Sequence, residues 1–346
     1  MEFADSKGSS FTTRRVNRTT FVIQEDDLFV ELPLIYVKLH PHNSVIILSD
    51  TGSDAPKEEH WHDRFIHLRD YIENCPITIN DNRPLNPKSG RQYVIICTHC
   101  HFDHLGGISQ FLEGGTTEIV ASAAGRDFIE SDLDTHGLFK YIGRPAPYYF
   151  VTKWAQAFER LSIVRGGGKV DLGITIIQTV GHTPDELAWY DHEEMHLYVG
   201  DSFYREGKEF MPILFPKEGN MIEWIFSMQK LAVFVRTQNT REAEAAALHE
   251  EDSGWVTVPR RVLLSCGHQT IAVDGADILA ELEAFSYQVL LGRVPVVEAV
   301  ERLGEMYYTW RETGQKRTPM SIMAPIRLMR ECRQFFGHDE VEDKQR

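Results

Sequence analysis

The stretch YVIICTHCHFDH, residues 93–104, decides the fold, because a continuous apolar run leads directly into a cluster of histidine and aspartate. The run 93–97 predicts a strand that is buried on both faces. In the extended segment that follows, His99 and His101 stand two residues apart and therefore point to the same side. Asp103 and His104 come from the turn after it. Imidazole and carboxylate groups are the usual ligands of zinc and similar divalent metals, so one short loop can supply two neighbouring ions.

The glycines that follow this loop and the cysteine within it also bear on its predicted structure. Gly106 and Gly107 are expected to let the backbone turn tightly beneath the ions. Cys100 lies between two predicted ligands, so we expect it to face away from them and to pack in the core. A second group of histidines in the segment 60–67 is interpreted as part of a solvated helix rather than as another metal site.

The same pattern returns at three later strand ends. The apolar runs 176–180, 197–199 and 263–266 each end in glycine, and the residue after the glycine is a potential metal ligand. Those ligands are His182, Asp201 and His268. The repetition predicts that ligands gather along one edge of packed sheets. An earlier strand, 44–49, ends in a turn that contains Asp50.

This arrangement resembles the metallo-β-lactamase-fold superfamily, whose motifs match in order over roughly residues 28 to 270. The resemblance implies an α/β fold, a four-layer αββα sandwich with metals at one edge. The present chain would add helical insertions and a C-terminal helical extension.

The resemblance also implies a binuclear centre with seven ligands: His99, His101, Asp103, His104, His182, Asp201 and His268. His99, His101 and His182 would bind the first ion, Asp201 would bridge, and the others would bind the second. Zinc is the expected metal, with iron or manganese as alternatives, because such ligands discriminate weakly between divalent ions.

The resemblance also concerns three further positions. Asp50 matches an early Asp-x-Gly turn that supports the metal loop without binding metal. Tyr204 stands three residues after Asp201, where lactonases of the superfamily carry a tyrosine that contacts the substrate carbonyl. Asp185 stands where glycine is usual, which is a departure from the pattern.

The ligand identities narrow the predicted chemistry. Asp201 replaces the cysteine of the lactamase subclasses with a cysteine ligand, and His101 replaces the glutamate of the flavodiiron oxidoreductases. Glyoxalase II-like thioesterases and lactonases remain compatible. The predicted reaction is cleavage of an ester-type bond, lactone or thioester, in a small molecule by a bridging hydroxide. Asp103 would orient the nucleophile and carry a proton to the leaving group.

Other functions share parts of this pattern and stay open. One is a mononuclear iron oxidoreductase of the persulfide dioxygenase type, and another is an RNase Z-like phosphodiesterase. A member that has lost its metals is a third. The formal net charge of −15 disfavours nucleic acid as a partner, because an acidic chain repels phosphate backbones.

Composition places the chain among globular proteins of a reducing compartment. Apolar residues make up 42% of its 346 residues. It has five cysteines, an odd number that does not indicate a disulfide framework. No apolar run has the length of a signal peptide core or a membrane span, so the prediction is a cytoplasmic protein without a membrane partner. Its oligomeric state is left open.

The predicted organisation has three parts. Residues 1–18 are expected to form a flexible tail, 19–274 the metallo-β-lactamase-like domain, and 275–346 a helical extension packed on it. Within the domain, 124–160 is interpreted as an inserted helical or loop segment. A helix is expected from Met221 to about Val235, followed by a charged, loop-like stretch over 236–258.

Overall fold

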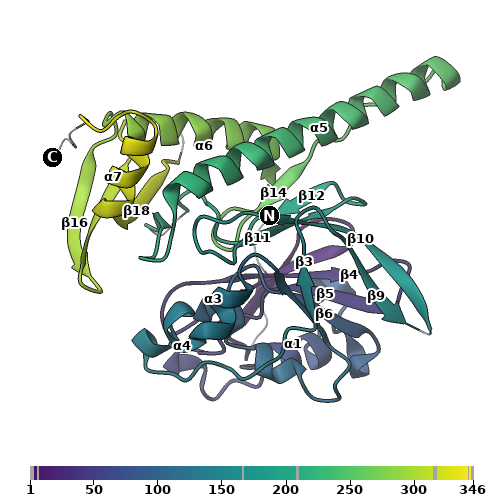
Figure 1. Cartoon of the computed structure of the whole chain (residues 1–346). Coiled ribbons are helices and arrows are strands. Elements are labelled where there is room, and N and C mark those ends of the chain that lie inside the picture. Colours follow the sequence, from purple (N-terminus) through teal and green to yellow (C-terminus); the bar gives the residue numbers. More distant parts are fainter. Residues whose placement is uncertain are drawn as a thin grey trace. The chain divides into compact units, whose positions relative to one another are not determined.

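The computed structural model describes residues 4–5, 8–165, 167–207, 210–314, 318–341 and 343. The chain divides after Gln178 into two compact units. Figure 1 colours the chain from its N-terminus to its C-terminus and labels the elements used below.

The first unit contains an eight-stranded sheet in which the strands follow one another in chain order. The neighbours from β1 to β5 are antiparallel, and those from β5 to β8 are parallel. The strands are β1 (Ala4–Asp5), β2 (Phe11–Arg15), β3 (Thr20–Glu25), β4 (Leu34–Leu39), β5 (Val45–Ser49), β6 (Gln92–Ile96), β7 (Glu118–Ser122) and β8 (Lys153–Ala155). A hairpin of β9 (Arg160–Arg165) and β10 (Gly168–Gln178) follows.

Short helices also contribute apolar side chains to the core of the first unit. The α-helices are α1 (Leu68–Asn74), α2 (Phe102–Leu105), α3 (Arg126–Ser131) and α4 (Leu133–His136), and the 3-10 helices are η1 (Glu58–His60), η2 (Thr78–Asn80), η3 (Pro87–Ser89), η4 (Ile108–Phe111) and η5 (Phe139–Ile142). Their apolar side chains pack with those of the sheet into one buried cluster. Cys97 and Cys100 belong to this cluster, and Cys100 packs as expected.

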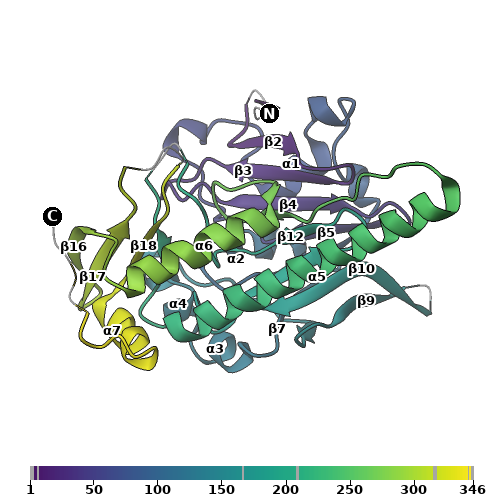
Figure 2. The same cartoon turned by 90° about the horizontal axis from the view of Figure 1, so that it is seen from above.

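The second unit contains two groups of strands. One has the order β15-β14-β12-β11, with β11 (Leu187–Asp191), β12 (His196–Tyr198), β14 (Leu263–Ser265) and β15 (Val273–Asp274). The other has the order β13-β18-β17-β16, with β13 (Ile213–Leu214), β16 (Val296–Arg302), β17 (Glu305–Arg311) and β18 (Ser321–Pro325). The helices are α5 (Met221–Ser253), α6 (Gly275–Leu290) and α7 (Ile326–Phe335). Figures 1 and 2 show α5 and α6 side by side.

The predicted α/β class is confirmed, but several elements differ from the sequence-based expectation. The stretch 236–253 continues α5 instead of forming a loop, and Gly254 ends the helix in a left-handed conformation. Beyond Val235 only Ala246 of this helix is buried. The segment is rich in alanine, glutamate and arginine, so intrinsic helix propensity favours it without the apolar periodicity that marks a packed helix.

Strands occur at both ends of the chain where none was expected. Residues 296–311 form the hairpin β16–β17, whose turn Leu303-Gly304 has positive φ at both positions, as a tight two-residue connection requires. In the segment predicted as a flexible tail, β2 pairs with β3 and buries Phe11 and Thr13. The Thr13 hydroxyl lies 2.6 Å from the Tyr71 hydroxyl.

The domain boundaries at residues 18 and 274 stay predictions. Within the described ranges, no helix combines the length and the apolar character that crossing a bilayer requires. The long α5 is polar over most of its surface.

A buried carboxyl group in the first unit yields a test of this fold. Glu25 accepts hydrogen bonds from the backbone N–H groups of Ser53 (2.7 Å) and Ala55 (3.2 Å). Burial nevertheless raises its pKa from 4.5 to about 7. Because the folded chain holds this proton more tightly than the unfolded chain, the stabilisation is present below pH 4.5 and is lost as the pH rises through 7.

We expect the free energy of unfolding of the wild type, relative to Glu25→Gln, to fall by on the order of 3 kcal/mol between about pH 4.5 and pH 8. Denaturant titrations at a series of pH values measure it. Glu73→Gln is the control with the opposite sign, because hydrogen bonds from Ser89, Arg69 and Tyr93 outweigh burial and lower the pKa of Glu73. A pH-independent difference for Glu25→Gln would contradict the prediction.

Candidate metal centre

The loop after β6 carries four of the predicted ligands, all of them buried. His99, His101, Asp103 and His104 are at most 6% exposed. His99 and His101 lie on the extended segment, whereas Asp103 and His104 belong to the single turn of α2. Nε2 of His99 lies 3.0 Å from Nδ1 of His101. That separation is close to the edge of about 3.3 Å expected between two nitrogens bound to one tetrahedral zinc ion.

The glycines after this loop have a different role from the one predicted. Neither Gly106 nor Gly107 has a positive φ. A Cβ atom at Gly106 would lie 2.2 Å from the Ser53 carbonyl oxygen, and one at Gly107 would lie 2.4 Å from that of Thr51. The glycines are therefore required by close packing against the turn after β5 rather than by a tight turn of their own.

Asp50 connects that turn to the ligand loop. Its Oδ1 accepts the backbone N–H of Thr98 at 2.7 Å, and its Oδ2 accepts the Thr98 hydroxyl at 2.9 Å. The same Oδ2 lies 2.9 Å from Nδ1 of His104. Asp50 therefore contacts the ligand loop directly, and its role as support of a metal site stays a prediction.

These contacts assign the protons of two imidazoles. An ionised carboxylate only accepts, so Nδ1 of His104 carries a proton, and in the neutral imidazole the lone pair is on Nε2. The Thr98 hydroxyl gives its proton to Asp50, so its oxygen accepts from Nδ1 of His99 at 3.1 Å. His99 consequently also presents Nε2 as the lone-pair atom, which is the state in which imidazole binds a metal.

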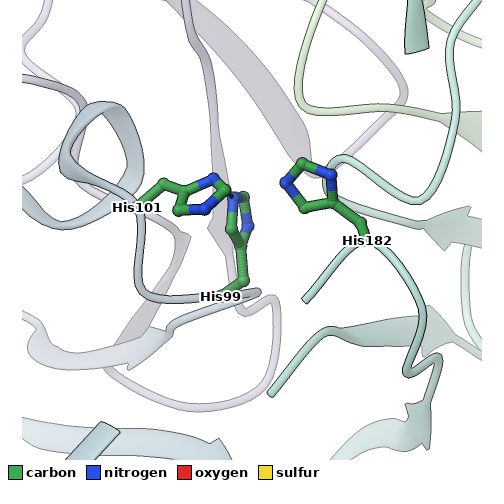
Figure 3. Close-up of side chains that lie close together, drawn as sticks. All are labelled: His99, His101 and His182. Carbon is green, nitrogen blue, oxygen red and sulfur yellow. Dashed lines mark hydrogen bonds between the residues drawn. The ribbon is translucent and has the colours of Figure 1, made fainter. Parts of the chain in front are cut away.

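His182 lies in the second unit, on the loop that follows Thr179, and its orientation is fixed by the main chain. Its Nδ1 donates to the Leu214 carbonyl at 2.7 Å, and a carbonyl can only accept, so the lone pair is on Nε2. Gly181 packs so closely on Trp224 that a Cβ would lie 2.4 Å from the Trp224 Cβ. Figure 3 shows the rings of His99 and His101 on the loop after β6 and the ring of His182 on its own loop.

Asp201 and His268 lie together in the second unit. His268 Nε2 is 3.2 Å from Asp201 Oδ2, and both side chains are buried. The two loops are joined by a backbone bond from Gly267 N–H to the Gly200 carbonyl at 2.6 Å. Glu186, which the sequence did not single out, accepts the Asp201 N–H at 3.0 Å.

Tyr204 is buried beside His268, with ring centroids 5.5 Å apart. Its hydroxyl donates to the Pro212 carbonyl at 2.9 Å. A hydrogen bond from this hydroxyl to a substrate carbonyl would replace that bond, so the predicted substrate contact stays a prediction. Asp185, the departure from the usual pattern, is buried as well.

The donor chemistry fits divalent metal ions. Two sets have the required composition, one of three imidazoles and one of two imidazoles and two carboxylates: His99, His101 and His182; Asp103, His104, Asp201 and His268. Burying so many polar groups is costly unless a cation or hydrogen bonds compensate them. In the first unit, burial and then the nearby Asp103 carboxylate raise the pKa of Asp27, so a second acidic group lies close to the loop.

A third group, Asp26, Glu59 and His60, differs in kind. Both ring nitrogens of His60 contact carboxylates, Asp26 at 2.9 Å and Asp63 at 2.7 Å. Although burial opposes it, these contacts raise the pKa of His60. The two carboxylates favour the protonated ring, and a protonated imidazole has no lone pair to offer a metal, so the group is described as an ion-pair cluster.

The chain is similar in sequence to known proteins of one family. The model of the metallo-beta-lactamase superfamily matches residues 45–247. A protein of Aspergillus versicolor that carries the provisional name transcription factor avaE is 28% identical over 291 residues, 84% of this chain and 79% of its own length. The human acyl-coenzyme A thioesterase MBLAC2 is 22% identical over 162 residues, 46% of this chain, and the match spans about half (53%) of that enzyme.

One solved structure supports the fold. An archaeal metallo-beta-lactamase superfamily protein from Sulfolobus tokodaii superposes with a TM-score of 0.50 at 13% identity, covering 83% of this chain and 91% of that one. At this identity the similarity concerns the fold alone.

The Asp50 network predicts the behaviour of Asp50→Asn. An amide cannot accept from Thr98 and His104 as the carboxylate does, so the imidazoles of His99 and His104 lose their fixed protonation. We expect zinc affinity to fall by about 10- to 100-fold, measured by competition with a chromophoric chelator. Asp54→Asn is the matched control, because Asp54 belongs to the same turn but contacts His67 and Gln110 instead. Equal losses in both variants would contradict the assignment.

Proposed function

The chain belongs to the metallo-beta-lactamase superfamily, and on that premise we propose that it is a metal-dependent hydrolase that cleaves an ester-type bond, a lactone or a thioester, in a small molecule. The observation that carries the proposal is the preorganised donor set. His99, His104 and His182 each hold a proton on Nδ1 through a specific acceptor and so present Nε2.

Within this proposal the seven predicted ligands would hold two divalent ions. His99, His101 and His182 would hold the first, Asp103, His104 and His268 the second, and Asp201 would contribute to both. Zinc suits these nitrogen and oxygen donors, and iron or manganese are alternatives. When bound, such ions polarise a carbonyl group and make hydroxide available near neutral pH.

The side chains would contribute orientation and proton transfer. Asp103 is buried, and its Oδ2 lies 3.3 Å from Nε2 of His104. We assign to Asp103 the orientation of the nucleophile and the delivery of a proton to the leaving group. Glu186 would keep Asp201 in place through the Asp201 N–H.

Two observations bear on the substrate. The similarity to an acyl-coenzyme A thioesterase supports a thioester, and the position of Tyr204 after Asp201 supports a lactone. Both bonds present a carbonyl carbon to the nucleophile, so the same residues serve either. The formal net charge of −15 disfavours nucleic acid as a substrate.

Metal removal tests the reaction class. We expect a chelator to abolish hydrolysis and zinc to restore it, on a panel of lactones, thioesters and phosphodiesters assayed with metal quantification. Two ions per chain with activity on a carbonyl ester support the proposal. One iron per chain with oxygen consumption would instead indicate an oxidoreductase.

Asp103→Asn tests the assignment of the proton carrier. The amide cannot take up and deliver a proton, so kcat should fall by about 100- to 10,000-fold on whichever substrate is turned over. Steady-state kinetics at saturating metal measure it, and Asp134→Asn, an acid on α4 of the first unit, is the control. Unchanged turnover in Asp103→Asn would remove Asp103 from the mechanism.

A further inference from the structure

The C-terminal strands of the second unit hold the residue that orients His182. β13 pairs in parallel with β18, with Leu214 opposite Met323, and the N–H of Phe215 donates to the Met323 carbonyl at 2.8 Å. Leu214 is the residue whose carbonyl accepts the Nδ1 proton of His182. Strand pairing with the C-terminal segment therefore sets the position of this acceptor.

A buried carboxylate fastens the preceding loop to the same strands. Glu206 has a side chain that is only 4% exposed, and it accepts from Nε and Nη2 of Arg311 at 3.0 and 2.7 Å. The Ser321 hydroxyl donates to it at 2.6 Å. Arg311 ends β17 and Ser321 begins β18. A forked, charge-assisted pair of this kind fixes direction as well as distance.

Arg311 also contacts the loop at a second point. Its guanidinium carbon lies 4.9 Å from the centre of the Phe210 ring, within the range of a cation–π contact. One side chain thus contacts both Glu206 and Phe210, which precede β13 in the chain.

We propose that Arg311 is a positioning residue for the metal centre. It holds the loop on the C-terminal strands, which keeps the Leu214 carbonyl where it fixes the tautomer of His182. The step to metal binding rests on the proposed function, whereas the effect on the imidazole does not.

The physical basis is the cost of an uncompensated buried charge. Without Arg311, Glu206 would be a buried carboxylate with one hydroxyl donor, which favours its movement towards water. Glu206 and Phe210 would then lose their attachment to the C-terminal strands, and the contact between Leu214 and His182 would weaken. Lysine would retain the charge but not the fork, so Arg311→Lys should give a smaller effect in the same direction.

The test uses the full chain with Arg311→Gln. In the metal-free protein, ¹⁵N NMR of the imidazoles should show His182 leaving the pure Nδ1–H tautomer of the wild type. In a competition with a chromophoric chelator, zinc affinity should fall by about 10- to 100-fold, which is typical when the group that orients a ligand is lost.

Arg260→Gln is the matched control. Arg260 is a more exposed arginine of the same unit, and its Nη2 lies 3.0 Å from Glu242 on α5. We expect this variant to keep both the His182 tautomer and the zinc affinity of the wild type. A loss of affinity as large as that of Arg311→Gln would show that any broken ion pair suffices and would overturn the proposal.

The remaining outcomes separate the two proposals. A wild-type tautomer and wild-type zinc affinity in Arg311→Gln would overturn the positioning role. A tautomer change in a chain whose wild type binds no zinc would support the positioning role and refute the proposed metal centre. Should Arg311→Gln fail to fold, Arg311→Lys carries the test, and an unchanged tautomer in it would overturn the proposal.

Discussion

The geometry of the first unit's ligand loop depends on the carboxylate of Asp50. This carboxylate accepts hydrogen bonds from the backbone N–H and the hydroxyl of Thr98 and from the ring of His104. The neighbouring Thr51 donates to the His104 carbonyl through both its N–H (2.8 Å) and its hydroxyl (3.0 Å). Asp50 adopts a φ of 66°, a conformation that aspartate tolerates better than most residues but that still costs energy. The bonds around it compensate that cost and fix two imidazoles at once.

In the second unit the predicted ligands are oriented by main-chain contacts instead of by a carboxylate such as Asp50. His182 is oriented by a main-chain carbonyl, and Asp201 is held by Glu186 through its own main chain. A carbonyl can be displaced only by moving the chain that carries it. Strand pairing and buried ion pairs at a distance therefore become part of the local chemistry, which explains why a segment outside the motifs bears on a ligand.

From the local sequence we predicted candidate ligands and the supporting Asp50, but not the acceptors Glu186 and the Leu214 carbonyl. The stretch 93–104 is informative because spacing alone places His99 and His101 on one side of an extended chain. Glu186 and Leu214 carry no such signal, since any acid or carbonyl could accept, and only folding decides which one does. The same limit applies to residues 296–311, whose charged and apolar residues fit a helix or a strand until β18 supplies a partner.

The orienting groups also make the two proposed donor sets chemically unequal. His104 is backed by the carboxylate of Asp50, which raises the basicity of the imidazole, whereas His182 is backed by a neutral carbonyl. One set consists of three imidazoles, and the other consists of two imidazoles with the carboxylates Asp103 and Asp201. Imidazole suits zinc and other late first-row metals, while carboxylate also accommodates manganese. On the proposed assignment, the metal preference of the two positions should therefore differ, because the chain provides negative charge mainly to one of them.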